Sequence, residues 1–167
     1  MNIKIRAITP KDLPHLLPIE IDCYPSAYWE ADDFRSVLSD KKNHGFLIEN
    51  QDDPNHAIVA FAVYSLEQGR MTIVNIAVSS NFRRQKLGLA IMERLMAKVG
   101  SRKEICLTIS DRNLDAQLFF RAMGFKAVRV ERNFYGRDHD GYNFVYNVGS
   151  PYKYDRNKQL DEICQGK

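Results

Sequence analysis

The chain has few cysteines and no long hydrophobic run. Its three cysteines, Cys23, Cys106 and Cys164, lie far apart in 167 residues and form no Cys-x-x-Cys pair. This spacing argues against a disulfide framework and against a thiolate metal site. Because no stretch of about eighteen apolar residues occurs, we expect no transmembrane helix. The first residues alternate polar and apolar like a strand, so we also expect no signal peptide and a cytoplasmic location.

The chain also lacks a strong charge of either sign. Lysine and arginine number 24 against 21 acidic residues, which gives a net charge of +3. A nucleic-acid-binding protein usually carries a concentrated basic face, so we expect no nucleic-acid partner, and no membrane partner either. The four histidines are scattered and have no ligand spacing, so no metal is implied.

The composition is that of a soluble globular protein with one domain. Hydrophobic residues make up 44% and charged residues 27% of the chain, and no internal repeat or linker divides it. We expect one domain over residues 1–149. The polar tail at 150–167 is expected to be a short helix or disordered.

The most informative segment, residues 72–95, joins an apolar strand, a cationic turn and an amphipathic helix. Residues 72–78 are rich in β-branched side chains, and the turn at 79–86 contains Arg83, Arg84 and Lys86. Apolar residues then recur at every fourth position, which predicts a helix. This stripe consists of Leu87, Ile91, Leu95 and Val99.

The start of this helix is suited to bind an anion. The first N–H groups of a helix lack partners within it, and the helix dipole adds about half a positive charge there. Gly88 has no Cβ, so a ligand can approach the backbone of the first turn, and Ala90 is nearly as permissive. The sequence therefore predicts a phosphate or pyrophosphate site, although a strand-turn-helix with a solvated basic turn would look similar.

This segment resembles one family. Gln85-x-x-Gly88-x-Ala90 fits the Gln/Arg-x-x-Gly-x-Gly/Ala motif of the GNAT acyl-CoA-dependent acetyltransferases, and residues 76–78 and 82–85 look like the strand and loop before it. The resemblance implies that acetyl-CoA is the co-substrate. The residues it implies for coenzyme binding are Ile76, Ala77, Val78, Arg83, Arg84, Gln85, Lys86, Leu87, Gly88, Leu89, Ala90, Asn113 and Phe119.

A second segment supports the same family. Asn113-x-x-Ala116 followed by Gly124-Phe125 resembles the GNAT segment Asn-x-x-Ala-x-x-Leu-Tyr-x-x-Leu-Gly-Phe, in which the Asn contacts the coenzyme. By its own chemistry Asn113 could also be a plain helix N-cap. Gly124 is expected to end this helix in a left-handed conformation.

Together with the two segments above, the remaining sequence predicts strands and helices in the order β-α-α-β-β-β-α-β-α-β-β. Predicted strands cover residues 3–7, 46–48, 57–64, 71–78, 105–109, 128–135 and 142–148, and predicted helices begin near Pro10, Glu30, Leu87 and Asn113. The resemblance implies the α+β GNAT fold: a mixed, mostly antiparallel twisted sheet of about seven strands, flanked by four helices. It also implies a V-shaped split between the two central strands, where backbone N–H groups of Ile76 and Val78 bind pantetheine and polarise the thioester.

Within the family, the sequence looks most like the ribosomal-protein alanine N-terminal acetyltransferases. Residues 28–34 resemble their Pro-Trp-Ser-Glu-x-x-Phe segment, and residues 132–135 resemble their Arg-Asn-Tyr-Tyr. The resemblance implies acceptor contacts for Trp29, Glu30 and Tyr135. A hydrophobic staple between Trp29 and Phe34 is an equal alternative.

Two positions depart from these enzymes. Thr108 stands where they have a glutamate base, and Phe120 stands where they have a tyrosine acid. Neither side chain can exchange a proton near pH 7. Tyr135 is the remaining candidate acid, and the candidate bases are Glu30, Asp111 and backbone carbonyls near Val78.

We therefore expect an acetyl-CoA-dependent N-acetyltransferase that transfers acetyl directly to a primary amine in a ternary complex. The acceptor could be a peptide N-terminus or a small molecule, and the protein a monomer or a homodimer. The missing glutamate and tyrosine leave a non-catalytic acyl-CoA-binding module as the alternative.

Overall fold

A computed structural model describes residues 1–149, which form two compact units. The first unit comprises Met1–Glu67 and Ile73–Gly100. The second comprises Gln68–Thr72 and residues 101–149. The predicted tail at 150–167 lies outside the described residues.

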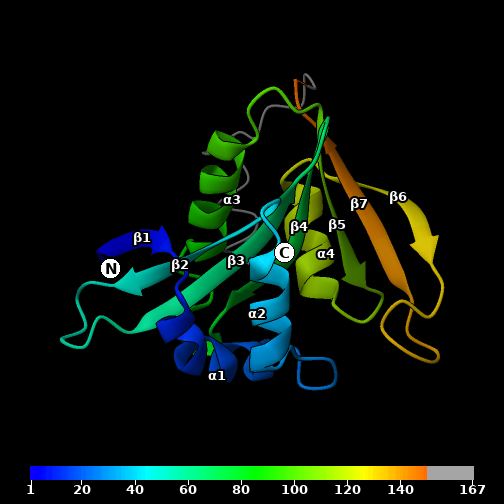
Figure 1. Ribbon diagram of the computed structural model, residues 1–167. Coiled ribbons are helices and arrows are strands. Elements are labelled where there is room, and N and C mark those ends of the chain that lie inside the picture. Colours follow the sequence, from blue (N-terminus) through cyan, green and yellow to red (C-terminus); the bar gives the residue numbers. More distant parts are fainter. Residues whose placement is uncertain (150–167) are drawn as a thin grey trace. The chain divides into compact units, whose positions relative to one another are not determined.

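The first unit contains three complete strands, most of a fourth, and three helices (Figure 1). The strands are β1 (Ile3–Ala7), β2 (Asn43–Asn50), β3 (Ile58–Leu66) and β4 (Arg70–Val78), of which β4 starts in the second unit. The helices are α1 (Leu13–Cys23), α2 (Ala31–Ser39) and α3 (Leu87–Lys98), with short 3-10 turns at Pro10–Asp12 and Ser80–Phe82.

The second unit is a β-hairpin paired to one further strand, with one helix. Its elements are β5 (Glu104–Ser110), α4 (Leu114–Ala122), β6 (Lys126–Glu131) and β7 (Gly141–Asn147). β7 pairs antiparallel with both β5 and β6. Gly124 ends α4 with a φ of 87°, which confirms the predicted left-handed C-cap.

The seven strands have the order β1-β2-β3-β4-β5-β7-β6 in one mixed sheet. β1 and β2 pair antiparallel, as do β2 and β3, whereas β4 and β5 are parallel and are joined through α3. The predicted α+β fold, with a mostly antiparallel seven-stranded sheet and four helices, is therefore confirmed. The β4–β5 ladder spans three pairs, from Arg70–Glu104 to Thr72–Cys106. The split between the central strands stays a prediction.

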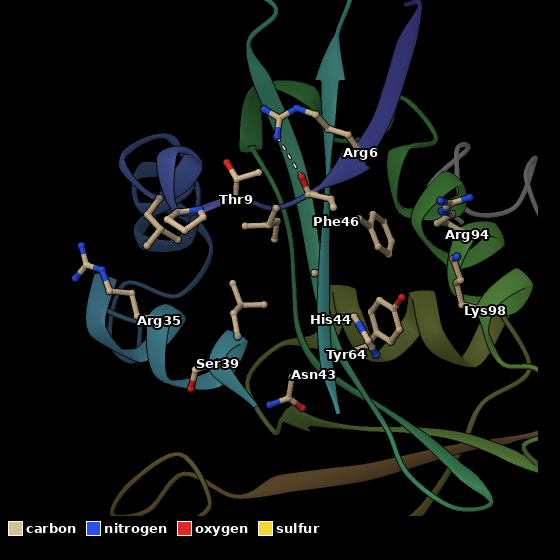
Figure 2. Close-up of a pocket in the computed structure, with 16 residues that line it drawn as sticks. Arg6, Thr9, Arg35, Ser39, Asn43, His44, Phe46, Tyr64, Arg94 and Lys98 are labelled. Atoms are coloured by element: carbon tan, nitrogen blue, oxygen red, sulfur yellow. Dashed lines mark hydrogen bonds between the residues drawn. The ribbon is translucent and has the colours of Figure 1, made fainter. Parts of the chain in front are cut away.

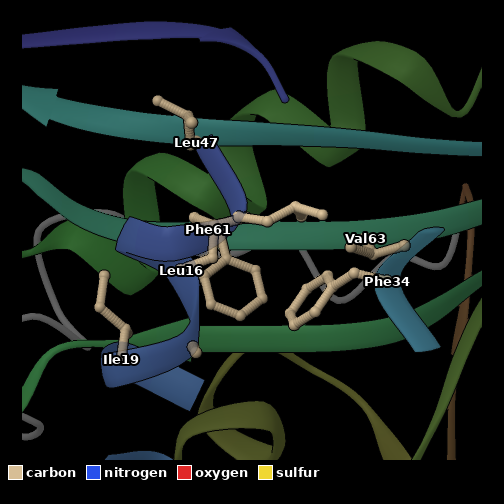
Figure 3. Close-up of a cluster of buried hydrophobic side chains, with 8 residues drawn as sticks. Leu16, Ile19, Phe34, Leu47, Phe61 and Val63 are labelled. Atoms are coloured by element: carbon tan, nitrogen blue, oxygen red, sulfur yellow. The ribbon is translucent and has the colours of Figure 1, made fainter. Parts of the chain in front are cut away.

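The core of the first unit lies between α1, α2 and the sheet (Figure 3). It contains Leu13, Leu16, Ile19, Phe34, Leu47, Phe61, Val63 and Ala77. Phe34 meets the rings of Trp29 and Phe61 edge to face, with centroids 5.2 and 5.6 Å apart. Because Trp29 precedes the N-cap Glu30 and Phe34 is four residues after that cap, the pair forms the hydrophobic staple that the sequence left open beside an acceptor contact.

Two strands differ most from their predicted limits, and the others differ by at most two residues at either end. β2 extends from 46–48 to Asn43–Asn50, because backbone pairing with β3 holds its polar ends in the ladder. β6 ends at Glu131 instead of residue 135. Asn133 has a φ of 56° and donates its backbone N–H to Asp140 Oδ1, so the chain turns there.

Candidate active site

The turn before α3 has the geometry predicted for an anion site. Arg84 and Lys86 have positive φ values of 62° and 66°, which are uncommon for residues with a side chain. Lys86 is the N-cap of α3, and its side chain makes no capping hydrogen bond. Ala90 N donates to Lys86 O at 3.1 Å. The N–H groups of residues 87–89 therefore precede the first hydrogen bond of the helix, where an anion can accept from them.

Side chains in this turn are not all directed to a ligand. Arg83 donates through Nε to Val78 O at 3.2 Å and through Nη2 to Cys23 Sγ at 3.4 Å, so its guanidinium folds back on the end of β4. Gln85 Nε2 lies 3.5 Å from Asn81 O. Arg83 and Gln85 therefore have hydrogen-bond partners within the protein itself.

The last turn of α1 holds the end of β4 at the strand predicted to bind pantetheine. Tyr24 Oη donates to Ile76 O at 2.6 Å, and Cys23 Sγ donates to Val78 O at 3.4 Å. Asp22 Oδ2 accepts from the backbone N–H of Ser80 at 2.8 Å. The carbonyls near Val78, which the sequence offered as candidate bases, thus already accept hydrogen bonds from side chains of α1.

Glu20 is a buried residue that sequence reasoning missed. Its side chain is 1% exposed, and its carboxylate accepts from Trp29 N at 3.0 Å and from Asn75 Nδ2 at 3.1 Å. Burial raises the pKa of Glu20 above its ordinary value of 4.5, and the two hydrogen bonds oppose this shift. Glu20 therefore ties the α1–α2 loop to β4.

Asn113 caps α4 in the second unit. Its Oδ1 accepts from Ala116 N at 3.1 Å, which is the capping geometry the sequence left open. Among residues 1–149, nothing accepts a hydrogen bond from its Nδ2, so the amide can still donate to a ligand while the oxygen caps the helix. The two predicted roles of Asn113 are therefore compatible.

Phe119 and Phe120 lie in an aromatic cluster of the same unit. Phe120 is 2% exposed and meets Phe119 and Phe125 edge to face, with centroids 5.1 Å away in both cases. Phe119 is only partly buried. Phe120 thus has a packing role where relatives are expected to have a tyrosine.

Tyr135 lies in the loop between β6 and β7, and Asp140 joins the two ends of this loop by hydrogen bonds. Its Oη donates to the backbone carbonyl of Thr108 at 2.7 Å. Burial raises the pKa of Tyr135 to about 12, above the value near 10 on which the sequence argument relied. Arg132 and Asn133 both bond Asp140, which holds the loop. Tyr135 is therefore well ordered but a weaker acid than an exposed tyrosine.

The two side chains offered as candidate bases, Glu30 and Asp111, lie on the surface or at a turn. Glu30 is exposed and caps α2, where its backbone N–H donates to Asp33 Oδ2 at 2.8 Å. Asp111 accepts a weak bond of 3.4 Å from Ser110 Oγ. Within residues 1–149, no group of three potential metal ligands occurs, and no helix is long and apolar enough to cross a membrane.

Comparison with known proteins identifies the family. The sequence profile of the Acetyltransferase (GNAT) family matches residues 13–125, which span the helix α1, the turn at 79–86 and the Gly124-Phe125 motif. The chain belongs to the GNAT acetyltransferase family. Membership makes this GNAT protein an acyltransferase and confirms the family predicted from residues 76–90 and 113–125.

Relatives and solved structures agree with this assignment. The chain is 27% identical over 133 residues to the [ribosomal protein bS18]-alanine N-acetyltransferase of Escherichia coli K12, covering 78% of this chain and 86% of the relative. The crystal structure of the ribosomal-protein-S18-alanine N-acetyltransferase from E. coli superposes with a TM-score of 0.73 at 24% identity. The match covers 88% of this chain and 94% of that chain. The crystal structure of Arabidopsis thaliana NAA60 in complex with acetyl-CoA superposes with a TM-score of 0.76 at 20% identity, and the match covers 88% of this chain and 99% of the NAA60 chain.

Proposed function

We propose that this GNAT protein transfers the acetyl group of acetyl-CoA directly to the α-amine of a peptide N-terminus. The observation that carries the proposal is the uncapped start of α3, preceded by the left-handed basic residues Arg84 and Lys86, in a chain of this family. The N–H groups of residues 87–89 would hold the coenzyme pyrophosphate, with Gly88 giving access to them. Asn113 Nδ2 would give the coenzyme a further hydrogen bond.

The missing glutamate at position 108 favours an α-amine over other amines. An α-amine has a pKa near 8, so about a quarter of it is already neutral near pH 7.4, whereas only about one lysine side chain in a thousand is. A site without a strong base can therefore use a peptide N-terminus much better than an alkyl amine. The E. coli relative is named a [ribosomal protein bS18]-alanine N-acetyltransferase, which supports a protein or peptide acceptor.

The state of Cys23 favours direct transfer over an acyl-cysteine intermediate. Its thiol donates to Val78 O, and burial raises its pKa even though Arg83 lies beside it. A thiol held in this way is a poor nucleophile because the thiolate is the reactive form. We therefore assign acetyl acceptance to the incoming amine itself, with Trp29 and Glu30 at the acceptor.

The first prediction tests the acceptor class with matched peptides. A peptide with a free N-terminal alanine and no lysine should release CoA thiol from acetyl-CoA, measured with a thiol reagent. The same peptide with an acetylated N-terminus and one internal lysine should release less than about a hundredth as much, following the neutral fractions above. Turnover should rise with pH toward the pKa of the α-amine.

Two results would contradict the proposal. Equal turnover with the lysine peptide or with an aminoglycoside would assign another acceptor. Tight binding of CoA with no turnover on any amine would instead support the non-catalytic acyl-CoA-binding module.

The second prediction concerns Tyr135. If its phenol protonates the leaving thiolate, Tyr135→Phe should lower kcat tenfold or more with little change in the KM for acetyl-CoA. The variant also loses the bond to Thr108 O, which should cost about 1 kcal/mol of unfolding free energy. Tyr142→Phe on β7 makes the same chemical change and should leave kcat within about twofold. An unchanged kcat in Tyr135→Phe would reduce Tyr135 to a packing residue.

A further inference from the structure

A cavity of about 600 Å³ in the first unit lies outside the predicted active site. It is formed by the end of β1 with the turn after it and by parts of α2, α3, β2 and β3. Sixteen residues line it, and none of them is Asp or Glu. Five of them are basic, namely Arg6, Arg35, His44, Arg94 and Lys98, so we call it the cationic cavity.

Within residues 1–149, the arginine and the lysine of the cavity that form no ion pair both lie on α3. Arg6 is bonded to Asp12 and Glu49, and Arg35 to Asp32, so these two guanidiniums already have anionic partners. Among residues 1–149, by contrast, neither Arg94 nor Lys98 forms an ion pair. The two are one helical turn apart on α3, where like charges repel. An anion between them would relieve this repulsion.

Aromatic rings lie next to these two cations. Figure 2 shows His44, Phe46 and Tyr64 on the same side of β2 as Arg94 and Lys98. The Tyr64 ring centroid is 5.5 Å from that of His44 and 6.1 Å from that of Phe46. Burial raises the pKa of Tyr64, and Arg94 is close enough for its charge to oppose that shift in part. Cations beside a ring cluster suit an anion that carries a flat apolar body.

The cationic cavity is separate from the turn at 79–86. Arg94 and Lys98 come six and ten residues after Gly88, which places them about 9 and 15 Å further along the helix axis. On β3, Val59 O accepts from Ser79 N at the turn, whereas Tyr64 lies five residues later, about 16 Å along the strand. The two features therefore occupy opposite ends of the first unit.

We infer that the cationic cavity binds a small organic anion, a carboxylate or phosphate on an aromatic body, with Arg94 and Lys98 holding the charge and His44 and Tyr64 contacting the ring. Figure 2 shows Thr9, Arg35 and Ser39 on the other side of β2, so the volume of about 600 Å³ is that of the whole cavity and the proposed site fills only its α3 side. The whole cavity falls within the range of small-molecule sites, about 300–1,000 Å³. The site does not depend on the proposed acetyl transfer.

The test uses the full chain and three probes of similar size: phenyl phosphate, benzoate and neutral benzyl alcohol. Binding is followed by the backbone amide signals of His44, Phe46 and Tyr64 in ¹H–¹⁵N spectra. Both anions should shift these signals, and benzyl alcohol should not. The double variant Arg94→Gln/Lys98→Gln should weaken anion binding at least tenfold. The control Lys41→Gln/Lys126→Gln removes the same charge from residues outside the cavity and should change affinity less than twofold.

Each result decides the inference. A response to phenyl phosphate alone, or to benzoate alone, supports the site and identifies the head group it takes. Equal shifts with benzyl alcohol would show a merely apolar surface and overturn it. Shifts confined to residues 83–90, or equal losses in the two double variants, would overturn it as well.

Discussion

Gly88→Val is expected to abolish CoA binding while the protein still unfolds in one cooperative transition. Gly88 is the second residue of α3 and is only partly buried, so we expect the valine variant to fold. Its branched side chain would cover the N–H groups of the first turn, to which we assign the pyrophosphate. Loss of all three N–H donors at residues 87–89 should weaken CoA binding by more than about a hundredfold, as measured by calorimetry.

Two comparison variants isolate the cause. Ala97→Val puts the same side chain on the exposed face of α3 and should leave CoA affinity unchanged. Arg84→Ala removes charge but keeps the backbone, and should weaken binding by about 1 kcal/mol, roughly fivefold, because exposed charge is screened. Equally large losses for Gly88→Val and Arg84→Ala would mean that side-chain charge, not backbone, holds the anion.

The features that sequence predicted best are those set by neighbouring residues. The stripe Leu87, Ile91, Leu95 and Val99 is buried as its spacing predicted. The Trp29–Phe34 staple and the Gly124 cap also follow from residues at most five positions apart. Such local patterns leave few alternatives, so the family motif could be recognised before any contact was known.

The features that sequence missed depend on distant partners. The sequence predicts Tyr135 as the last residue of a strand, but its bond to Thr108 joins residues 27 positions apart and depends on the loop that Asp140 holds. Its raised pKa follows from burial, which no local pattern reports. Similarly, the sequence offered Arg83 as ligand charge, whereas it contacts Cys23, 60 positions away.

The burial of Glu20 could have been predicted from the helical spacing of residues 13–20. Leu13, Leu16 and Glu20 share one helical face, so the spacing placed a carboxylate among core residues. A buried carboxylate needs hydrogen-bond partners, but its partner Asn75 is 55 positions away and could not be inferred.

Glu20→Ala is expected to lower the free energy of unfolding by about 3 kcal/mol or more. The truncation leaves the Trp29 N–H and the Asn75 amide without their acceptor, at about 1–3 kcal/mol for each unpaired buried group, and adds a cavity. Urea denaturation of the wild type and the variant measures this difference. The exposed α2 change Asp32→Ala should cost less than about 1 kcal/mol, because its ion pair with Arg35 is on the surface.

Glu20→Gln separates the hydrogen bonds from the charge. A glutamine oxygen can still accept from Trp29 N. If the Asn75 amide flips, its Oδ1, which accepts from no other group among residues 1–149, can accept from the glutamine NH₂. Because burial raises the pKa of Glu20 in the folded state, the ionised side chain costs stability above that pKa. The cost disappears as pH falls toward the ordinary value of 4.5, so the wild type should gain stability relative to Glu20→Gln over this interval. Other carboxylates also change the free energy of unfolding with pH. Arg6, for example, lowers the pKa of Asp12, so protonating Asp12 in acid destabilises the fold. Such effects are the same in both proteins and cancel in the difference between their unfolding free energies. A difference that is constant with pH would mean that Glu20 keeps its ordinary pKa and that only its hydrogen bonds hold the α1–α2 loop to β4.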